Sequence, residues 1–204
     1  MELARITVAG WAVATVVGAA TTGCGDYHHT SPSTSIPGTA ASSTGSSAVT
    51  SPAPGQQTDY SNLLIKASDI GADFTTPQPP VLNPNNAPGV AQLFANADNS
   101  RRIGDTILIV ADPKVAAAGI ENTKANYAGK VSGTWQPIDI GSNGAMISGT
   151  APGNPQAITV VLFNEGKALV NLEFDSAPND PTDPGVATDI ARKQDAAIKT
   201  GLPG

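Results

Sequence analysis

Hydrophobic positions in the C-terminal part of the chain follow the two-residue period of a sheet. Residues 158–163 (Ile-Thr-Val-Val-Leu-Phe) are apolar on both faces, as in a central strand that is covered on both sides. Every second residue from Ala168 to Phe174 is apolar, which is typical of a half-buried strand. Residues 164–167 between them form a turn in which Gly166 can take a positive φ. The pattern predicts an antiparallel hairpin.

Two further pairs of strands are predicted upstream. Residues 135–140 and 145–148 flank Gly-Ser-Asn-Gly at 141–144, where Asn-Gly favours a tight turn. Pro137 cannot donate a hydrogen bond to a sheet, so its strand is expected at an edge or a bulge. Between about 92 and 110 we expect two more strands, connected through Arg101-Arg102 and Gly104-Asp105, with 106–110 as the second strand.

Two helices have clear start signals. Asp112 precedes Pro113, an N-cap followed by proline at the first helical position, and the stretch to about Ala128 is rich in alanine. Gly119 would permit close packing of this helix on the sheet. Its apolar side consists of Ala116, Ile120 and Tyr127.

The C-terminal helix is capped by Thr182 or Asp183, begins at Pro184 and ends near Gly201. On its polar face we expect the ion pairs Asp189–Lys193 and Asp195–Lys199, each four residues apart. Its buried stripe is predicted to consist of Val186, Ala187, Ile190, Ala197 and Ile198.

The order of these elements is β-β-α-β-β-β-β-α after an irregular entry. In that entry, residues 63–70 fit a short strand or a turn of helix, and 75–88 fit a proline-rich loop. The order predicts a single α+β domain over residues 60–204: a mostly antiparallel β-sheet of about six strands packed against two main helices.

The N-terminus has the pattern of a bacterial lipoprotein signal peptide. Residues 6–20 carry no charge and are too few to span a bilayer, and small residues then lead to Gly23-Cys24. We therefore expect residues 1–23 to be removed and Cys24 to receive a diacylglyceryl group. Because Thr21 stands where such sites usually carry Leu, Val or Ile, an ordinary secretory signal cut near Ala20 and an uncleaved anchor stay open.

Residues 24–59 are dominated by Ser, Thr, Pro, Gly and Ala. Such a segment cannot bury enough apolar area to offset the entropy of ordering, so we expect a disordered tether. The chain has a net charge of −6, which argues against binding to nucleic acid and against electrostatic docking on anionic lipid. The acyl chains on Cys24 would hold the protein at the membrane.

The predicted domain contains neither histidine nor cysteine, because His28, His29 and Cys24 all precede it. This excludes a Ser-His-Asp triad, a cysteine nucleophile and a His-ligated zinc site, and we expect no cofactor and no metal. A hydrolase with paired carboxylates stays possible, although most of the acids lie at predicted turns, caps or exposed strand positions. Those acids are Asp105, Asp112, Asp139, Glu165, Glu173 and Asp175.

Two other features bear on ligand binding. Residues 175–183 concentrate oxygen ligands and are compatible with calcium, although turn and cap requirements explain the same residues. Trp135 and Tyr127 are candidates for lining a ligand cleft between helix and sheet, and their alternative role is in the core.

Several segments carry a family resemblance: Gly23-Cys24, the Ser/Thr/Pro tether, Gly-Thr-Trp-Gln-Pro-Ile-Asp-Ile at 133–140, the 158–174 hairpin and Lys-Gln-Asp-Ala-Ala-Ile-Lys at 193–199. On these segments the chain resembles mycobacterial-type cell-envelope lipoproteins of the LpqN/LpqT kind. The resemblance implies a PsbP-like α/β/α sandwich. Through Leu63-Leu64-Ile65 and Asp69-Ile70 the chain is also similar to the extracellular sensor domain of PknH-type membrane kinases.

Together these features predict a lipid-anchored protein on the extracytoplasmic face of the cell membrane. We expect a non-enzymatic module that binds an envelope protein or a small apolar ligand. A carrier of a lipid or another apolar molecule is the alternative, and a hydrolase is the third interpretation.

Overall fold

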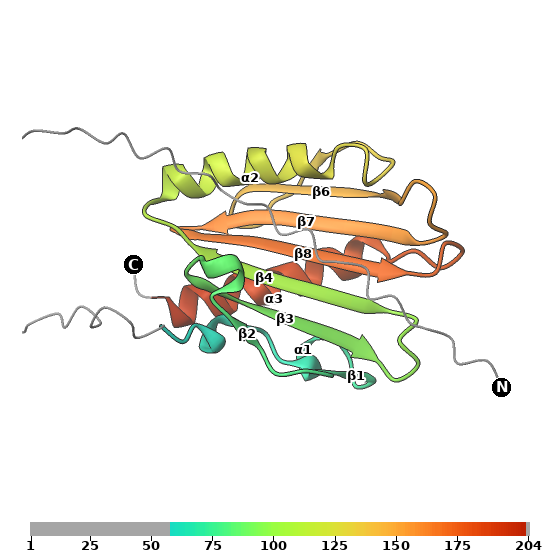
Figure 1. Cartoon of the computed structure of the whole chain (residues 1–204), viewed down its shortest axis with the longest axis horizontal. Coiled ribbons are helices and arrows are strands. Elements are labelled where there is room, and N and C mark those ends of the chain that lie inside the picture. Colours follow the sequence, from blue (N-terminus) through green and yellow to red (C-terminus); the bar gives the residue numbers. More distant parts are fainter. Residues whose placement is uncertain (1–57, 203–204) are drawn as a thin grey trace, which may run out of the picture. The chain divides into compact units, whose positions relative to one another are not determined.

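An antiparallel sheet forms the frame of residues 58–202, the part of the chain that the computed structural model describes (Figure 1). The strand order is β1-β3-β4-β8-β7-β6-β5, and β2 also pairs with β3. The strands are β1 (Phe74–Thr75), β2 (Val81–Leu82), β3 (Gly89–Asn96), β4 (Arg102–Ile109), β5 (Gln136–Pro137), β6 (Ser142–Thr150), β7 (Ala157–Glu165) and β8 (Ala168–Ser176). The predicted α+β class is confirmed. The sheet has eight strands rather than about six because the two-residue strands β1 and β2, which the sequence did not indicate, pair with β3 at one edge.

The predicted signal peptide, Cys24, both histidines and nearly all of the predicted tether lie outside the described residues. Within residues 58–202, no helix combines the length and hydropathy that a membrane crossing requires.

Helices cover both faces of the sheet (Figure 1). One face packs against α2 through a cluster that includes Ile120, Val160 and Leu162. The other face packs against α3 through a larger cluster that includes Phe94, Phe163 and Phe174. The helical segments are η1 (Ser61–Leu63), α1 (Ala67–Ile70), η2 (Pro84–Asn86), α2 (Pro113–Tyr127) and α3 (Pro184–Gly201).

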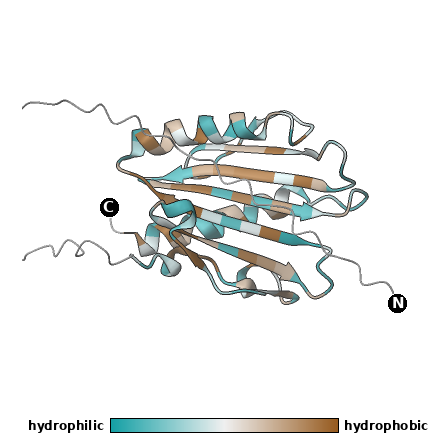
Figure 2. Ribbon diagram, in the orientation of Figure 1, coloured by the Kyte–Doolittle hydropathy of each residue, from teal (hydrophilic) through white to brown (hydrophobic). Residues whose placement is uncertain are grey.

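The central hairpin agrees with its hydrophobic pattern. Strand β7 lies between β6 and β8 with a helix over each face, which explains why both sides of it are apolar. Figure 2 shows how hydrophobic and hydrophilic positions are distributed along these strands. Gly166 takes a φ of 53° in the turn to β8.

Both predicted helix starts are confirmed. The Asp112 side chain accepts hydrogen bonds from the backbone N–H groups of Lys114 and Val115 at 2.8 and 3.0 Å. Asp183, rather than Thr182, caps α3 and accepts from Gly185 and Val186 at 2.8 and 3.2 Å. These bonds satisfy backbone donors that have no partner within the helix.

The predicted start of β4 was wrong. The strand begins at Arg102, so Gly104 and Asp105 lie inside it and not in the connection from β3. Asp105 pairs in register with Gln92 of β3 and Leu172 of β8. Because the charged Asp105 interrupts the apolar pattern, the sequence did not indicate that residues 102–105 belong to the strand.

The predicted turn before β6 was also misplaced. Strand β6 begins at Ser142, and its register with β7 shifts between Ser142 and Ala145. Asn143 has a φ of 55°, so the Asn-Gly pair forms an irregularity within the strand. Pro137 lies in the edge strand β5, as predicted.

Two expectations for α3 need correction. Val186 is 50% exposed, and Gln194 and Asp195 occupy the buried side instead. Asp195 forms the predicted pair with Lys199 at 2.6 Å, but Asp189 pairs with Arg192. In the entry segment, residues 63–70 contain the end of η1 and all of α1, joined by residues 64–66 that are not helical. The predicted loop at 75–88 begins at the end of β1 and contains β2 and η2.

Candidate functional site

A groove with a volume of about 300 Å³ lies between α2 and the β5–β6 edge of the sheet. We call it the Trp135 groove. It is lined by Glu121 and Lys124 of α2 and by Trp135, Gln136, Pro137, Asn143, Gly144 and Ala145. Small-molecule sites in proteins occupy about 300–1,000 Å³, so this groove has the volume of a site for a small ligand.

Trp135 and Tyr127, the two aromatic residues proposed from the sequence to line a cleft, lie against each other. Their ring centroids are 6.1 Å apart and their planes meet at 70°, an edge-to-face arrangement. Trp135 lines the groove, whereas Tyr127, the last residue of α2, does not line it and contacts the Trp135 ring.

The Tyr127 hydroxyl is fixed by two residues of β8. It donates to Glu173 Oε2 at 2.5 Å and accepts from Asn171 Nδ2 at 3.0 Å. Burial, together with the negative charge of Glu173, raises the pKa of Tyr127 above its ordinary value. The hydroxyl therefore stays protonated at physiological pH, which keeps the ring in place beside Trp135.

The polar lining offers both donors and acceptors. Lys124 Nζ lies 2.8 Å from Glu121 Oε1, with Lys124 23% and Glu121 69% exposed. Asn143 donates through Nδ2 to Asn164 Oδ1 at 2.8 Å, which orients its amide. Gln136 adds an exposed amide. Because its only two charged side chains are of opposite sign, the groove has no net charge.

The sequence-based prediction named Trp135 but missed the polar residues around it. Glu121 and Lys124 fell within the predicted helix and Gln136 within the predicted strand at 135–140, and Asn143 was assigned to the turn at 141–144. The sequence did contain one signal for Asn143, because an Asn-Gly pair beside an edge strand indicates either a turn or a bulge. Both of these use left-handed backbone.

A second hollow, of about 60 Å³, lies beside the N-terminal half of α3. This volume is well below the roughly 300 Å³ at which small-molecule sites begin. Its apolar lining consists of Ile70, Phe74, Ile103, Phe174, Val186 and Ile190, with Arg101, Arg102, Asp175 and Thr182 also contributing. The hollow is therefore too small to enclose an acyl chain.

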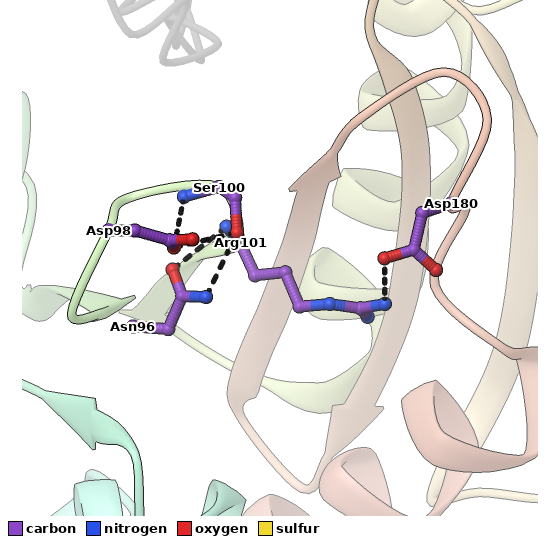
Figure 3. Close-up of polar contacts among 5 residues, drawn as sticks. All are labelled: Asn96, Asp98, Ser100, Arg101 and Asp180. Atoms are coloured by element: carbon purple, nitrogen blue, oxygen red, sulfur yellow. Dashed lines mark hydrogen bonds and ion pairs between the residues drawn. The ribbon is translucent and has the colours of Figure 1, made fainter.

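Arg101, which lines this hollow, extends from the β3–β4 turn. Figure 3 shows the polar contacts that hold it there. Asp98 accepts from the backbone N–H and the hydroxyl of Ser100 at 3.0 and 2.7 Å, and these bonds lower the pKa of Asp98. Asn96 Oδ1 accepts from the Arg101 N–H at 3.0 Å. The Arg101 guanidinium reaches Asp180 at 2.5 Å, joining the turn to the loop that precedes α3.

Of the carboxylates considered for hydrolysis, Glu173 and Asp175 lie near each other on β8, but each is engaged by another side chain. Glu173 is bonded to Tyr127, Asp175 is paired with Arg102 at 3.0 Å, and neither lines the Trp135 groove. Burial, and next the charge of Glu173, raise the pKa of Asp175 to about 6, while Arg102 acts in the opposite direction. The other four acids lie in separate parts of the fold: Asp105 inside β4, Asp112 at the α2 cap, exposed Asp139, and Glu165, which lies 3.6 Å from Lys199.

The oxygen-rich loop at 175–183 directs its carboxylates to separate partners. Asp175 pairs with Arg102, Asp180 with Arg101, and Asp183 caps α3. Across residues 58–202, no group of three or more His, Cys, Asp or Glu side chains is arranged to hold a metal ion.

Asp105 is the largest departure from expectation. It was predicted in an exposed connection, but it is fully buried, and neither carboxyl oxygen has a hydrogen-bond partner within the described part of the chain. Gln92, directly opposite on β3, donates its amide N–H groups to the carbonyls of Gln78 and Leu93 instead. Burial raises the pKa of Asp105 to about 8.

Among known proteins, similarity is found at the level of solved structures. No protein-family model matches the chain, and no curated protein matches it. The chain is similar to the extracellular domain of PknH from Mycobacterium tuberculosis, with a TM-score of 0.44 and 10% sequence identity, over 66% of this chain and 93% of that chain. At this level of similarity the comparison carries no conclusion about ligand or activity.

Proposed function

We propose that this chain is an exported lipoprotein, anchored through Cys24, whose folded domain is a non-enzymatic binding module at the cell envelope. The observation that carries the binding role is the Trp135 groove, with its supported aromatic residue and its uncharged balance of donors and acceptors. The anchoring role rests on the sequence pattern that ends at Gly23-Cys24.

The composition of the groove favours recognition over catalysis. Its two ionisable side chains, Glu121 and Lys124, neutralise one another at 2.8 Å. The domain sequence supplies no histidine or cysteine that could act as a base or nucleophile there. Binding requires only the ring of Trp135 and hydrogen bonds from the surrounding amides.

The same lining disfavours the lipid carrier. A carrier needs a cavity of several hundred Å³ with aliphatic walls, but apart from Trp135 the apolar residues of this groove are Pro137, Ala145 and Gly144. A polar or amphiphilic ligand fits these side chains better than an acyl chain does.

A fragment screen by NMR tests the binding role. The full chain is labelled with ¹⁵N and exposed to neutral, charged, aromatic and aliphatic fragments. We expect shift changes that cluster on Trp135, Gln136 and Asn143 and that weaken in Trp135→Ala. Trp135→Phe, which retains a ring, separates loss of contact from loss of fold.

Val81→Ala serves as the matched control, because Val81 is 56% exposed on β2, at the other edge of the sheet. Fragments that bind nowhere, or only outside the groove, would contradict the proposed binding role.

A further inference from the structure

The aromatic surface of the Trp135 groove is held in position before any ligand arrives. Tyr127 contacts the indole at a centroid distance of 6.1 Å, and Glu173 and Asn171 fix the Tyr127 hydroxyl. A side chain that is already ordered loses little entropy when a ligand packs on it, so the energy of contact goes into affinity. An indole offers a ligand a flat apolar face together with one N–H donor.

The polar groups around the indole match a ligand that both donates and accepts at several points. Gln136 and Asn143 each carry an amide, which combines an acceptor oxygen with N–H donors. Glu121 adds acceptors and Lys124 adds donors. A hydroxyl group is itself donor and acceptor, so a ligand with several hydroxyls can satisfy this mixed set.

The charges in the groove argue against an anionic or a cationic ligand. An anion attracted by Lys124 would be repelled by the Glu121 carboxylate, which lies 2.8 Å from the same ammonium group. A cation attracted by Glu121 would be repelled by that ammonium group. The groove is open and its volume of about 300 Å³ lies at the lower end of small-molecule sites, so its ligand is a small one.

We propose that the Trp135 groove binds a neutral saccharide, with the apolar C–H face of a sugar ring packed on the indole. The ring hydroxyls bond to Gln136, Asn143 and Glu121. This inference rests on the proposed binding role of the groove and adds the chemical class of its ligand.

Fluorescence provides a direct test, because the chain has two tryptophans, Trp11 and Trp135. In the full chain carrying Trp11→Phe, purified in detergent, Trp135 is the sole tryptophan. The probes are glucose, mannose, galactose, arabinose, maltose and cellobiose. We expect at least one of them to shift the Trp135 emission in a saturable manner.

Gln136→Ala tests the recognition of hydroxyls, since it removes an exposed amide without disturbing the core. Loss of one hydrogen bond should weaken the responding sugar about 3- to 10-fold. Val81→Ala, at the other edge of the sheet, should leave the affinity unchanged.

The two proposals fail in different ways. If fragments bind the groove but none of the six sugars changes the emission of Trp135 or the NMR signals of the groove, the saccharide inference is wrong and the binding role stands. If neither fragments nor sugars bind there, both are wrong. A sugar response that persists unchanged in Gln136→Ala and in Trp135→Ala, followed by NMR, would place the sugar elsewhere and overturn the inference.

Discussion

At the scale of single residues, Asp105 is the most informative, because it is buried inside the sheet and its carboxyl group has no hydrogen-bond partner among residues 58–202. Its pKa in the folded chain is about 8, against about 3.9 in an unfolded chain. Below about pH 4 the group is protonated in both states and costs no ionisation energy. Between about pH 4 and 8 only the unfolded chain ionises, so this residue lowers stability as the pH rises, and above pH 8 the penalty becomes constant.

Asp105→Asn removes this ionisation at nearly constant shape. We expect the stability of the variant relative to wild type to increase from pH 4 to pH 8 by about 4–5 kcal/mol, at 1.36 kcal/mol for each pKa unit. Urea unfolding at several pH values measures the difference. Asp139→Asn, at an exposed position, is the control and should show no such trend. A stability difference that is independent of pH would show that Asp105 ionises normally.

At the scale of secondary-structure elements, the sequence predicted most of the parts whose signals are local. The caps Asp112 and Asp183 and the turn at Gly166 depend on neighbouring residues, so the pattern located them correctly. Asp105 and Gln194 could not be placed in this way, because their burial depends on strands and helices that are distant in the sequence. The sequence indicated Trp135 and Tyr127 as a pair, but not the α2 side chains that complete the groove, for the same reason.

The sequence also did not predict the contact between α3 and the segment that contains η1 and α1. Gln194 is fully buried; its Nε2 donates to the Leu63 carbonyl at 2.7 Å and its Oε1 accepts from the Ile65 N–H at 3.1 Å. These two bonds satisfy backbone groups of a segment that belongs to neither the sheet nor a long helix. Gln194 therefore ties the η1–α1 segment to α3.

Gln194→Met keeps the length of the side chain but removes both bonds. Two buried backbone groups then lose their partners, and we expect a loss of about 2–4 kcal/mol in unfolding free energy. Hydrogen exchange at the Ile65 amide should accelerate more than exchange in β7. Thr188→Ala, a half-buried position on the same helix whose hydroxyl donates to the Pro184 carbonyl, is the control. Equal protection of Ile65 in the variant and wild type would show that other contacts hold the segment.

At the scale of the whole molecule, a net charge of −6 constrains how the protein can be held at a membrane. Removal of residues 1–23 would delete Glu2 and Arg5, one acid and one base, so the processed chain would keep the same charge. Anionic lipid would repel such a chain, and this leaves acyl chains on Cys24 as the proposed anchor. Burial of acyl chains is hydrophobic, whereas salt at about 1 M reduces the Debye length to about 3 Å and releases proteins that are held by charge.

Wild-type protein is therefore expected to stay in the membrane fraction after a wash in about 1 M NaCl and to leave it in detergent. Cys24→Ala removes the thiol that would accept the diacylglyceryl group, so the variant should be released or should accumulate as unprocessed precursor. Fractionation followed by intact-mass spectrometry distinguishes these products. Cys24→Ala protein that fractionates and migrates like wild type would rule out lipidation and leave the ordinary secretory signal or the uncleaved anchor.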